Sequence, residues 1–137
     1  MMIREIIRDE SFLAIPSAPA TADDLGIGAD LLDTLRAHKD ACVGLAANMI
    51  GIRKCIIAVA DEGVEYVMYN PQIIKKSGVY DAKEGCLSLS GERKTKRYKT
   101  IRLRYYDAQF RRRSGFFEGW IAQIIQHEID HCMGIII

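Results

Sequence analysis

The periodicity of the apolar residues changes at Gly119, and this change limits which folds the chain can adopt. Before it, the stretch KTIRLRYYDA (Lys99–Ala108) alternates apolar with mainly basic residues, as a half-buried β-strand does. After it, the following residues fall on one helical stripe, at i, i+4, i+7 and i+11: Trp120, Ile124, His127 and His131. Gly134 is a natural stop for that helix. The chain must therefore combine strands with a C-terminal helix.

A second helix is predicted near the N-terminus. The segment ADLLDTLRAHKDA places its three leucines on one face and turns charged side chains away from them. We expect an amphipathic helix that begins near Ala22 or Ala29 and ends near Ala41. Thr21, followed by acidic residues in the first turn, is typical of a helix N-cap.

Strands are predicted in the middle of the chain. Lys54–Ala60 and Val64–Asn70 are rich in β-branched residues, and the acidic-glycine segment between them suits a tight hairpin turn. Pro71–Tyr80 continues the strand character, whereas VGLAANMIG (Val43–Gly51) is expected to be a loop or bent strand. These patterns predict an α+β fold, with mixed or antiparallel strands wrapped around a buried C-terminal helix that carries the HEIDH sequence.

Composition narrows the class of protein. The 137 residues, 49% of them hydrophobic, suit one domain spanning residues 1–137. Nineteen basic and eighteen acidic residues leave little net charge, which argues against a specific nucleic-acid binder. The N-terminal residues lack the apolar core of a signal peptide, and no stretch has the roughly 20 apolar residues of a membrane span. Four cysteines without a C-x-x-C pair fit reduced thiols, and a cytoplasmic protein is expected.

The C-terminal helix carries a candidate metal site. His127 and His131 lie four positions apart, about 400° of helical rotation, so both imidazoles leave the same face and can share one ion. Glu128 lies beside the ion, where a carboxylate can take a proton from an activated water. The alternative is an ordinary helix with buried, hydrogen-bonded histidines.

A catalytic site of this kind usually has three protein ligands. His38 is on the surface side of the first helix, and Cys132 is roughly 140° from the histidine stripe, so acidic residues and the other cysteines remain. The better candidate is EGCLS (Glu84–Ser88), where Cys86 follows a glycine between two strand-like stretches, because thiol and backbone can approach an ion closely there. A nearby dication would keep the Cys86 sulfur deprotonated.

Three segments together resemble the motifs of peptide deformylases: GLAAN (Gly44–Asn48), EGCLS and QHEIDH (Gln126–His131). They occur in the order of that family, and three ordered motifs are far more specific than H-E-x-x-H alone. The resemblance spans roughly Val43 to Gly134. It implies a metal-dependent hydrolase that removes the formyl group from N-formylmethionine at the start of nascent chains.

The resemblance also implies roles for individual residues. Cys86, His127 and His131 would bind one divalent metal, most often Fe²⁺ in this family, with Ni²⁺, Co²⁺ or Zn²⁺ accepted. Glu128 would act as general base and then general acid. The backbone N–H of Leu87 would help to hold the oxyanion of the tetrahedral intermediate.

Further residues are expected to meet the substrate. The resemblance places Gly44 and Arg93 beside the substrate chain. The helical stripe places Trp120 and Ile124 so that they could form the wall of a pocket for the methionine side chain, although plain core packing explains them equally well.

The sequence departs from the family at Met49. The family has glutamine there, whose amide is the other oxyanion donor, and a thioether cannot donate a hydrogen bond. Losing one such donor typically costs about 3 kcal/mol of transition-state stabilisation. Asn48, the preceding residue, has a side-chain amide. However, neighbouring residues of an extended segment point to opposite sides, so Asn48 is not expected to replace the missing oxyanion donor.

Basic residues raise the question of a ribosome contact. The FRRRSG turn (Phe110–Gly115) and the cluster Arg93, Lys94, Lys96, Arg97 and Lys99 could meet phosphates transiently, although such runs are more often solvated strand faces. Three other functions remain open: a hydrolase of another N-acylated substrate, a catalytically weak metal-containing binder of peptide N-termini, and an H-E-x-x-H endopeptidase. The endopeptidase would leave the first two motifs unexplained.

Overall fold

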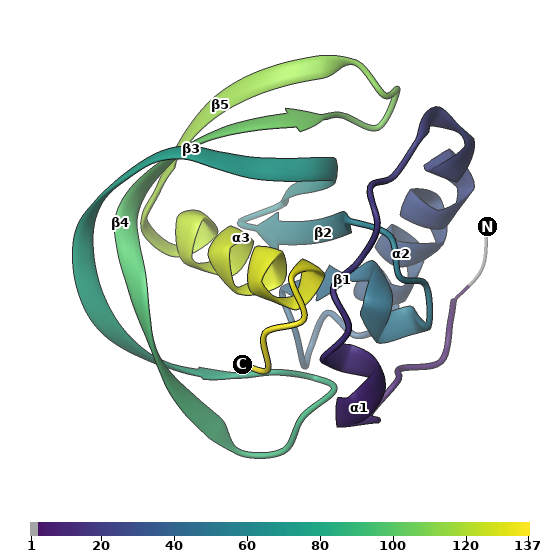
Figure 1. The fold of residues 1–137 in the computed structure, drawn as a ribbon, viewed down its shortest axis with the longest axis horizontal. Coiled ribbons are helices and arrows are strands. Elements are labelled where there is room, and N and C mark those ends of the chain that lie inside the picture. The colour runs from purple at the N-terminus through teal and green to yellow at the C-terminus, as the bar shows by residue number, and fades with distance from the viewer. Residues whose placement is uncertain (1–2) are drawn as a thin grey trace.

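A computed structural model describes residues 3–137, and it combines one antiparallel sheet with helices on its faces (Figure 1). In chain order the elements are α1 (Glu10–Leu13), the 3₁₀ turn η1 (Ala22–Asp24), α2 (Leu25–Ala37), β1 (Gly44–Ala46), the 3₁₀ turn η2 (Ala47–Ile50), β2 (Ile56–Asp61), β3 (Val64–Gly85), β4 (Glu92–Tyr106), β5 (Arg112–Glu118) and α3 (Gly119–Cys132). The five strands pair in the order of the chain. The predicted α+β class is confirmed.

The long strands β3 and β4 curve around α3, which lies on the concave side of the sheet (Figure 1). The sheet can bend because the pairing of β3 with β4 shifts register between Tyr69 and Gln72, on either side of Pro71, and again between Ile73 and Lys75. Proline has no N–H for the ladder and commonly occupies such irregular positions. The bend lets the sheet follow the helix, which packs mainly against β4 and the short strands β1 and β2.

The change of period at Gly119 marks the junction of β5 with α3. Gly119 has a φ of 70°, a conformation that favours glycine, so the chain turns from the strand directly into the helix. Nine of the fourteen residues of α3 are buried, from Ala122 to Cys132. The prediction of a buried C-terminal helix is confirmed.

The N-terminal helix is shorter than predicted. Thr21 caps the start as expected, through a reciprocal capping box with Asp24, but the first turn is the 3₁₀ turn η1. Helix α2 ends at Ala37 instead of Ala41, because the N–H of His38 bonds the carbonyl of Leu35 three residues back and the chain continues as a tight turn.

Among the described residues, no helix is both long and apolar enough to cross a membrane.

Two expectations about basic residues were wrong. The connection predicted at FRRRSG is shorter, because β5 already begins at Arg112. Arg97 does not lie on a solvated strand face: it is 3% exposed, and its guanidinium pairs with Glu84 (2.6 Å) and Asp130 (2.7 Å). A buried guanidinium needs such carboxylate partners to offset its lost hydration.

Candidate metal centre and substrate cavity

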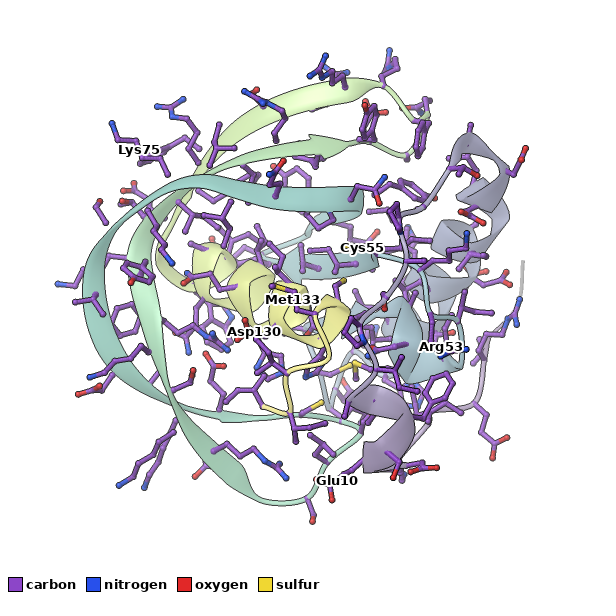
Figure 2. The ribbon with its side chains drawn as sticks, in the orientation of Figure 1. Glu10, Arg53, Cys55, Lys75, Asp130 and Met133 are labelled. Atoms are coloured by element: carbon purple, nitrogen blue, oxygen red, sulfur yellow. The ribbon has the colours of Figure 1, made fainter. Side chains whose placement is uncertain are left out.

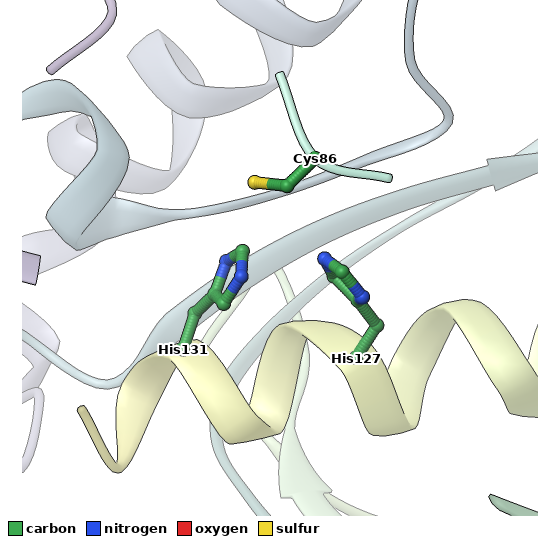
Figure 3. A group of neighbouring side chains, drawn as sticks. All are labelled: Cys86, His127 and His131. Atoms are coloured by element: carbon green, nitrogen blue, oxygen red, sulfur yellow. The ribbon is translucent and has the colours of Figure 1, made fainter. Parts of the chain in front are cut away.

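Cys86 meets the two histidines of α3 (Figure 3). Cys86 follows directly on the end of β3, and His127 and His131 extend toward it from successive turns of the helix. Their potential ligand atoms all lie within 4.8 Å of one another, and both rings are buried. One thiol and two imidazoles are therefore gathered closely enough to share a single ion.

Glu84 orients His127. Its Oε1 lies 2.8 Å from Nδ1 of the ring, and because a carboxylate only accepts hydrogen bonds, Nδ1 carries the proton and Nε2 is left free. Arg97 holds the same carboxylate through both of its oxygens, and Gln123 donates a further bond of 2.9 Å. This network places the free nitrogen on the side of Cys86.

The charges of the cluster favour a cation. Burial raises the pKa of the Cys86 thiol, but hydrogen bonds from His127 and His131 outweigh burial and lower the pKa to about 7. Burial lowers the pKa of His127, yet Cys86 and Glu84 bring it to about 9. Burial likewise lowers the pKa of His131, while Glu128 and Cys86 bring it to about 11. The thiolate and the carboxylates thus stabilise positive charge between them, as a metal site requires.

Both nitrogens of His131 have neighbours. Nδ1 lies 3.3 Å from the Met49 sulfur and 3.3 Å from Glu128 Oε1, and Nε2 lies 3.3 Å from the main-chain oxygen of Ile137. Binding a metal through either nitrogen replaces one of these contacts. The donor set fits a divalent transition metal, because thiolate and imidazole suit iron, nickel, cobalt and zinc.

Glu128 is buried beside the cluster and is incompletely hydrogen-bonded. Its Oε1 has no partner of good hydrogen-bond geometry among the described residues, and its distance to His131 is the long 3.3 Å contact. On the other side lies Gly44 of β1, where a built Cβ would come within 2.8 Å of Glu128 Oε2. A carboxylate held in this way has an oxygen available for a proton from a reacting molecule.

A cavity of about 700 Å³ opens over the cluster. Its lining includes most of the predicted site residues: Gly44, Cys86, Leu87, Trp120, Ile124, His127 and Glu128. Trp120 is 53% exposed, so it is not a core residue, whereas Ile124 is buried at the cavity wall. The N–H of Leu87 has no hydrogen-bond partner within residues 3–137.

Met49 and Asn48 are buried and lie outside the cavity lining. The Met49 sulfur accepts the N–H of Ala46 at 3.4 Å. The segment is not extended as assumed, because both residues belong to the 3₁₀ turn η2. The Asn48 amide donates to the carbonyls of His131 (3.0 Å) and Leu13, so it ties the end of α3 to the N-terminal segment and does not face the cavity.

The cavity lining does not include Arg93, whose guanidinium lies 3.4 Å from Glu10 of α1. Arg8 lines the cavity instead and donates from Nη1 to the carbonyl of Leu87 at 2.7 Å. Sequence reasoning missed Arg8 because the contact joins segments 79 residues apart.

Known proteins resemble the chain over its full length. The family model for polypeptide deformylase matches residues 8–137. A peptide deformylase of Clostridium beijerinckii is 50% identical over 136 residues, which cover 99% of this chain and 100% of that protein.

Solved structures agree with this match. A class I type b peptide deformylase of Acinetobacter baumannii with bound Met-Ala-Ser superposes with a TM-score of 0.88 at 28% identity, covering 98% of this chain and 96% of that one. The Thermus thermophilus peptide deformylase gives a TM-score of 0.86 at 31% identity, covering 98% of this chain and 82% of that one. The chain belongs to the polypeptide deformylase family.

Proposed function

We propose that this chain hydrolyses the formamide of N-formylmethionine at the start of nascent polypeptides and releases formate. The observation that carries the proposal is the meeting of Cys86, His127 and His131 beside Glu128 at the wall of a cavity of about 700 Å³. A hydrolytic site needs a metal position, a proton acceptor and room for a substrate, and these residues supply all three. The 137 residues act as one catalytic domain.

Cys86, His127 and His131 would hold one divalent ion. When bound, the ion polarises the formyl carbonyl and makes water more acidic. We propose Fe²⁺ as the native metal, with Ni²⁺, Co²⁺ or Zn²⁺ as substitutes, since one thiolate and two imidazoles accept all of them.

Glu128 moves the proton. Water attacks the formyl carbon while the Glu128 carboxylate takes its proton, and the carbonyl π bond becomes the oxyanion of a tetrahedral intermediate. As the C–N bond breaks, Glu128 returns the proton to the departing amine. Formate and a peptide with a free N-terminal methionine are the products.

The oxyanion and the side chain of the substrate meet different parts of the cavity. The free N–H of Leu87 donates to the oxyanion, and Met49 supplies no second donor. Trp120 and Ile124 form an apolar wall for the methionine side chain, and Gly44, which lines the cavity next to Glu128, meets the substrate main chain. The peptide deformylase relatives favour this reaction over the other functions that the sequence left open.

The test is formate release. The protein is purified without oxygen, loaded with Fe²⁺ or Ni²⁺, and given formyl-Met-Ala. We expect formate from the wild type and its loss in Glu128→Gln, which keeps the metal. Cys86→Ala should lose both the metal, measured by elemental analysis, and activity. A metal-loaded wild type that releases no formate would contradict the proposal.

A transient ribosome contact in the cytoplasm is part of the proposal, because nascent chains are the substrate. We define the basic face as Lys75, Arg102, Arg104 and Arg112, which are all exposed on β3–β5. None of the four has an ion-pair partner within the described chain, whereas Arg93, Lys96, Arg97, Arg111 and Arg113 are paired with acids. Figure 2 shows Lys75 on the outer side of the sheet, away from α3. Unpaired cations of this kind favour phosphates.

A further inference from the structure

Arg8 stands at the rim of the catalytic cavity. Its side chain is exposed, and its Nη1 donates to the carbonyl of Leu87 at 2.7 Å. A guanidinium has five N–H donors, and this bond uses one of them. The remaining donors are available at the mouth of the cavity that Arg8 lines.

The charge of Arg8 is not neutralised by the protein. No carboxylate within residues 3–137 forms an ion pair with it, whereas Arg97 in the same region is held by Glu84 and Asp130. Two other charged side chains line the rim without an ion pair in the described chain, Lys83 and Glu92. The rim therefore carries two cations against one anion, with Arg8 fixed in place by its bond to Leu87.

The inner and outer parts of the cavity differ in chemistry. The wall near the metal cluster includes Trp120, Ile124 and Leu89, which suit an apolar side chain. A peptide that places its first side chain there and its formyl carbonyl at the Leu87 N–H must continue past the rim. Because Arg8 is bonded to Leu87 itself, its guanidinium lies within reach of the next residues of such a peptide.

We infer that Arg8 recognises the residues that follow formyl-methionine and favours a substrate with a carboxylate at the third position. The inference rests on the proposed deformylation for its substrate. Arg8 contributes a charge-assisted hydrogen bond from a preorganised guanidinium, which is stronger than a contact between two mobile surface chains. Glu92 opposes this preference from the same rim.

Arg36 provides the control. It is an exposed arginine of α2 whose guanidinium pairs with Glu65, and it does not line the cavity. Its removal changes the net charge by the same amount as removal of Arg8. A selective effect of Arg8 therefore reports position and not overall charge.

The experiment compares formyl-Met-Ala-Glu-amide with formyl-Met-Ala-Lys-amide on the metal-loaded enzyme, since amidation removes the terminal carboxylate. We expect wild type to favour the Glu peptide in kcat/KM by roughly three- to tenfold, mainly through KM. Arg8→Gln should abolish the preference and Arg8→Lys should keep part of it. Arg36→Gln should keep all of it, and Glu92→Gln should enlarge it.

The products Met-Ala-Glu-amide and Met-Ala-Lys-amide, titrated calorimetrically, give the same comparison without turnover. If no formate is released but the two products still differ in affinity in an Arg8-dependent way, the proposed function is contradicted and the role of Arg8 stands. An unchanged Glu-to-Lys ratio in Arg8→Gln would overturn the inference. So would an equal loss of kcat for both peptides, because Arg8 would then act only by holding the Leu87 loop.

Discussion

Met49 occupies the position where the resemblance predicts an oxyanion donor, and its sulfur is directed at the N–H of Ala46 and the ring of His131. We predict that Met49→Gln raises kcat by about tenfold or more, because the amide adds the donor that the oxyanion lacks, and one such donor is typically worth 10²–10³-fold. Steady-state formate release measures the change.

Met49→Leu is the control for this substitution, since it removes the sulfur and adds no donor. Its kcat should not rise. Equal rates for the glutamine and leucine variants, with equal metal content, would mean that the oxyanion is already fully held by other groups such as the N–H of Leu87.

Gly44 leaves the space that the Glu128 carboxylate occupies. A Cβ there would lie 2.8 Å from Glu128 Oε2 and 2.8 Å from Ile124, and the carboxylate is the group that can shift. We predict that Gly44→Ala lowers kcat by about 10²-fold, since a displacement near 1 Å costs that much, while metal content stays unchanged. Gly26→Ala is the control, because its Cβ meets nothing within 4 Å; a similar loss of activity there would refute the steric explanation.

Helices and strands were predicted best from the sequence where the residues of their buried face repeat at a regular spacing. The second half of β4 was predicted correctly because Ile101, Leu103 and Tyr105 alternate with polar residues along it. Helix α3 was predicted correctly because His127 and His131 repeat at helical spacing. The β2–β3 hairpin was correct because its turn residues are strong local signals.

The elements that sequence reasoning missed depend on distant contacts. The first half of β4 has no apolar alternation, so nothing local indicated that Arg97 is buried by Glu84 and Asp130, 13 and 33 residues away. Likewise η2 is a 3₁₀ turn whose Asn48 bonds the end of α3, 83 residues later. Local propensity contains no information about such partners.

Arg97 joins β3, β4 and α3 through one guanidinium. We predict that Arg97→Ala lowers the free energy of unfolding by about 3–5 kcal/mol, because the buried Glu84 and the partly buried Asp130 would both lose the guanidinium that neutralises them. Metal affinity should fall by roughly 10–100-fold, since Glu84 orients His127. Denaturant unfolding and competition with a metal indicator measure the two effects.

Lys96→Ala, on the adjacent position of β4, is the control for Arg97→Ala. Lys96 pairs with Asp81 in solvent, where such pairs are worth roughly 0–1 kcal/mol. Comparable destabilisation by both substitutions would show that burial of the Arg97 network contributes nothing beyond an ordinary surface ion pair.

At the scale of the whole molecule, the curved sheet separates two surfaces. The cavity lies on the side of α3, near Cys86, where β3 ends and β4 begins. Arg102 and Arg104 alternate with the buried Ile101, Leu103 and Tyr105, so they face outward. Arg102 is ten residues along β4 from Glu92, roughly 33 Å of extended strand. A partner on the basic face would therefore leave the cavity open to a peptide.

This separation allows ribosome binding to be changed without changing chemistry. We predict that the double variant Arg102→Glu, Arg104→Glu loses ribosome association in sedimentation assays and shows a shallower salt dependence, because each lost phosphate contact reduces the slope by about one. Formate release from a free peptide should stay within about twofold of wild type. The double variant Lys39→Glu, Arg53→Glu makes the same charge change at exposed cations outside the basic face, so an equal loss of association there would show that net charge, and not the basic face, governs the contact.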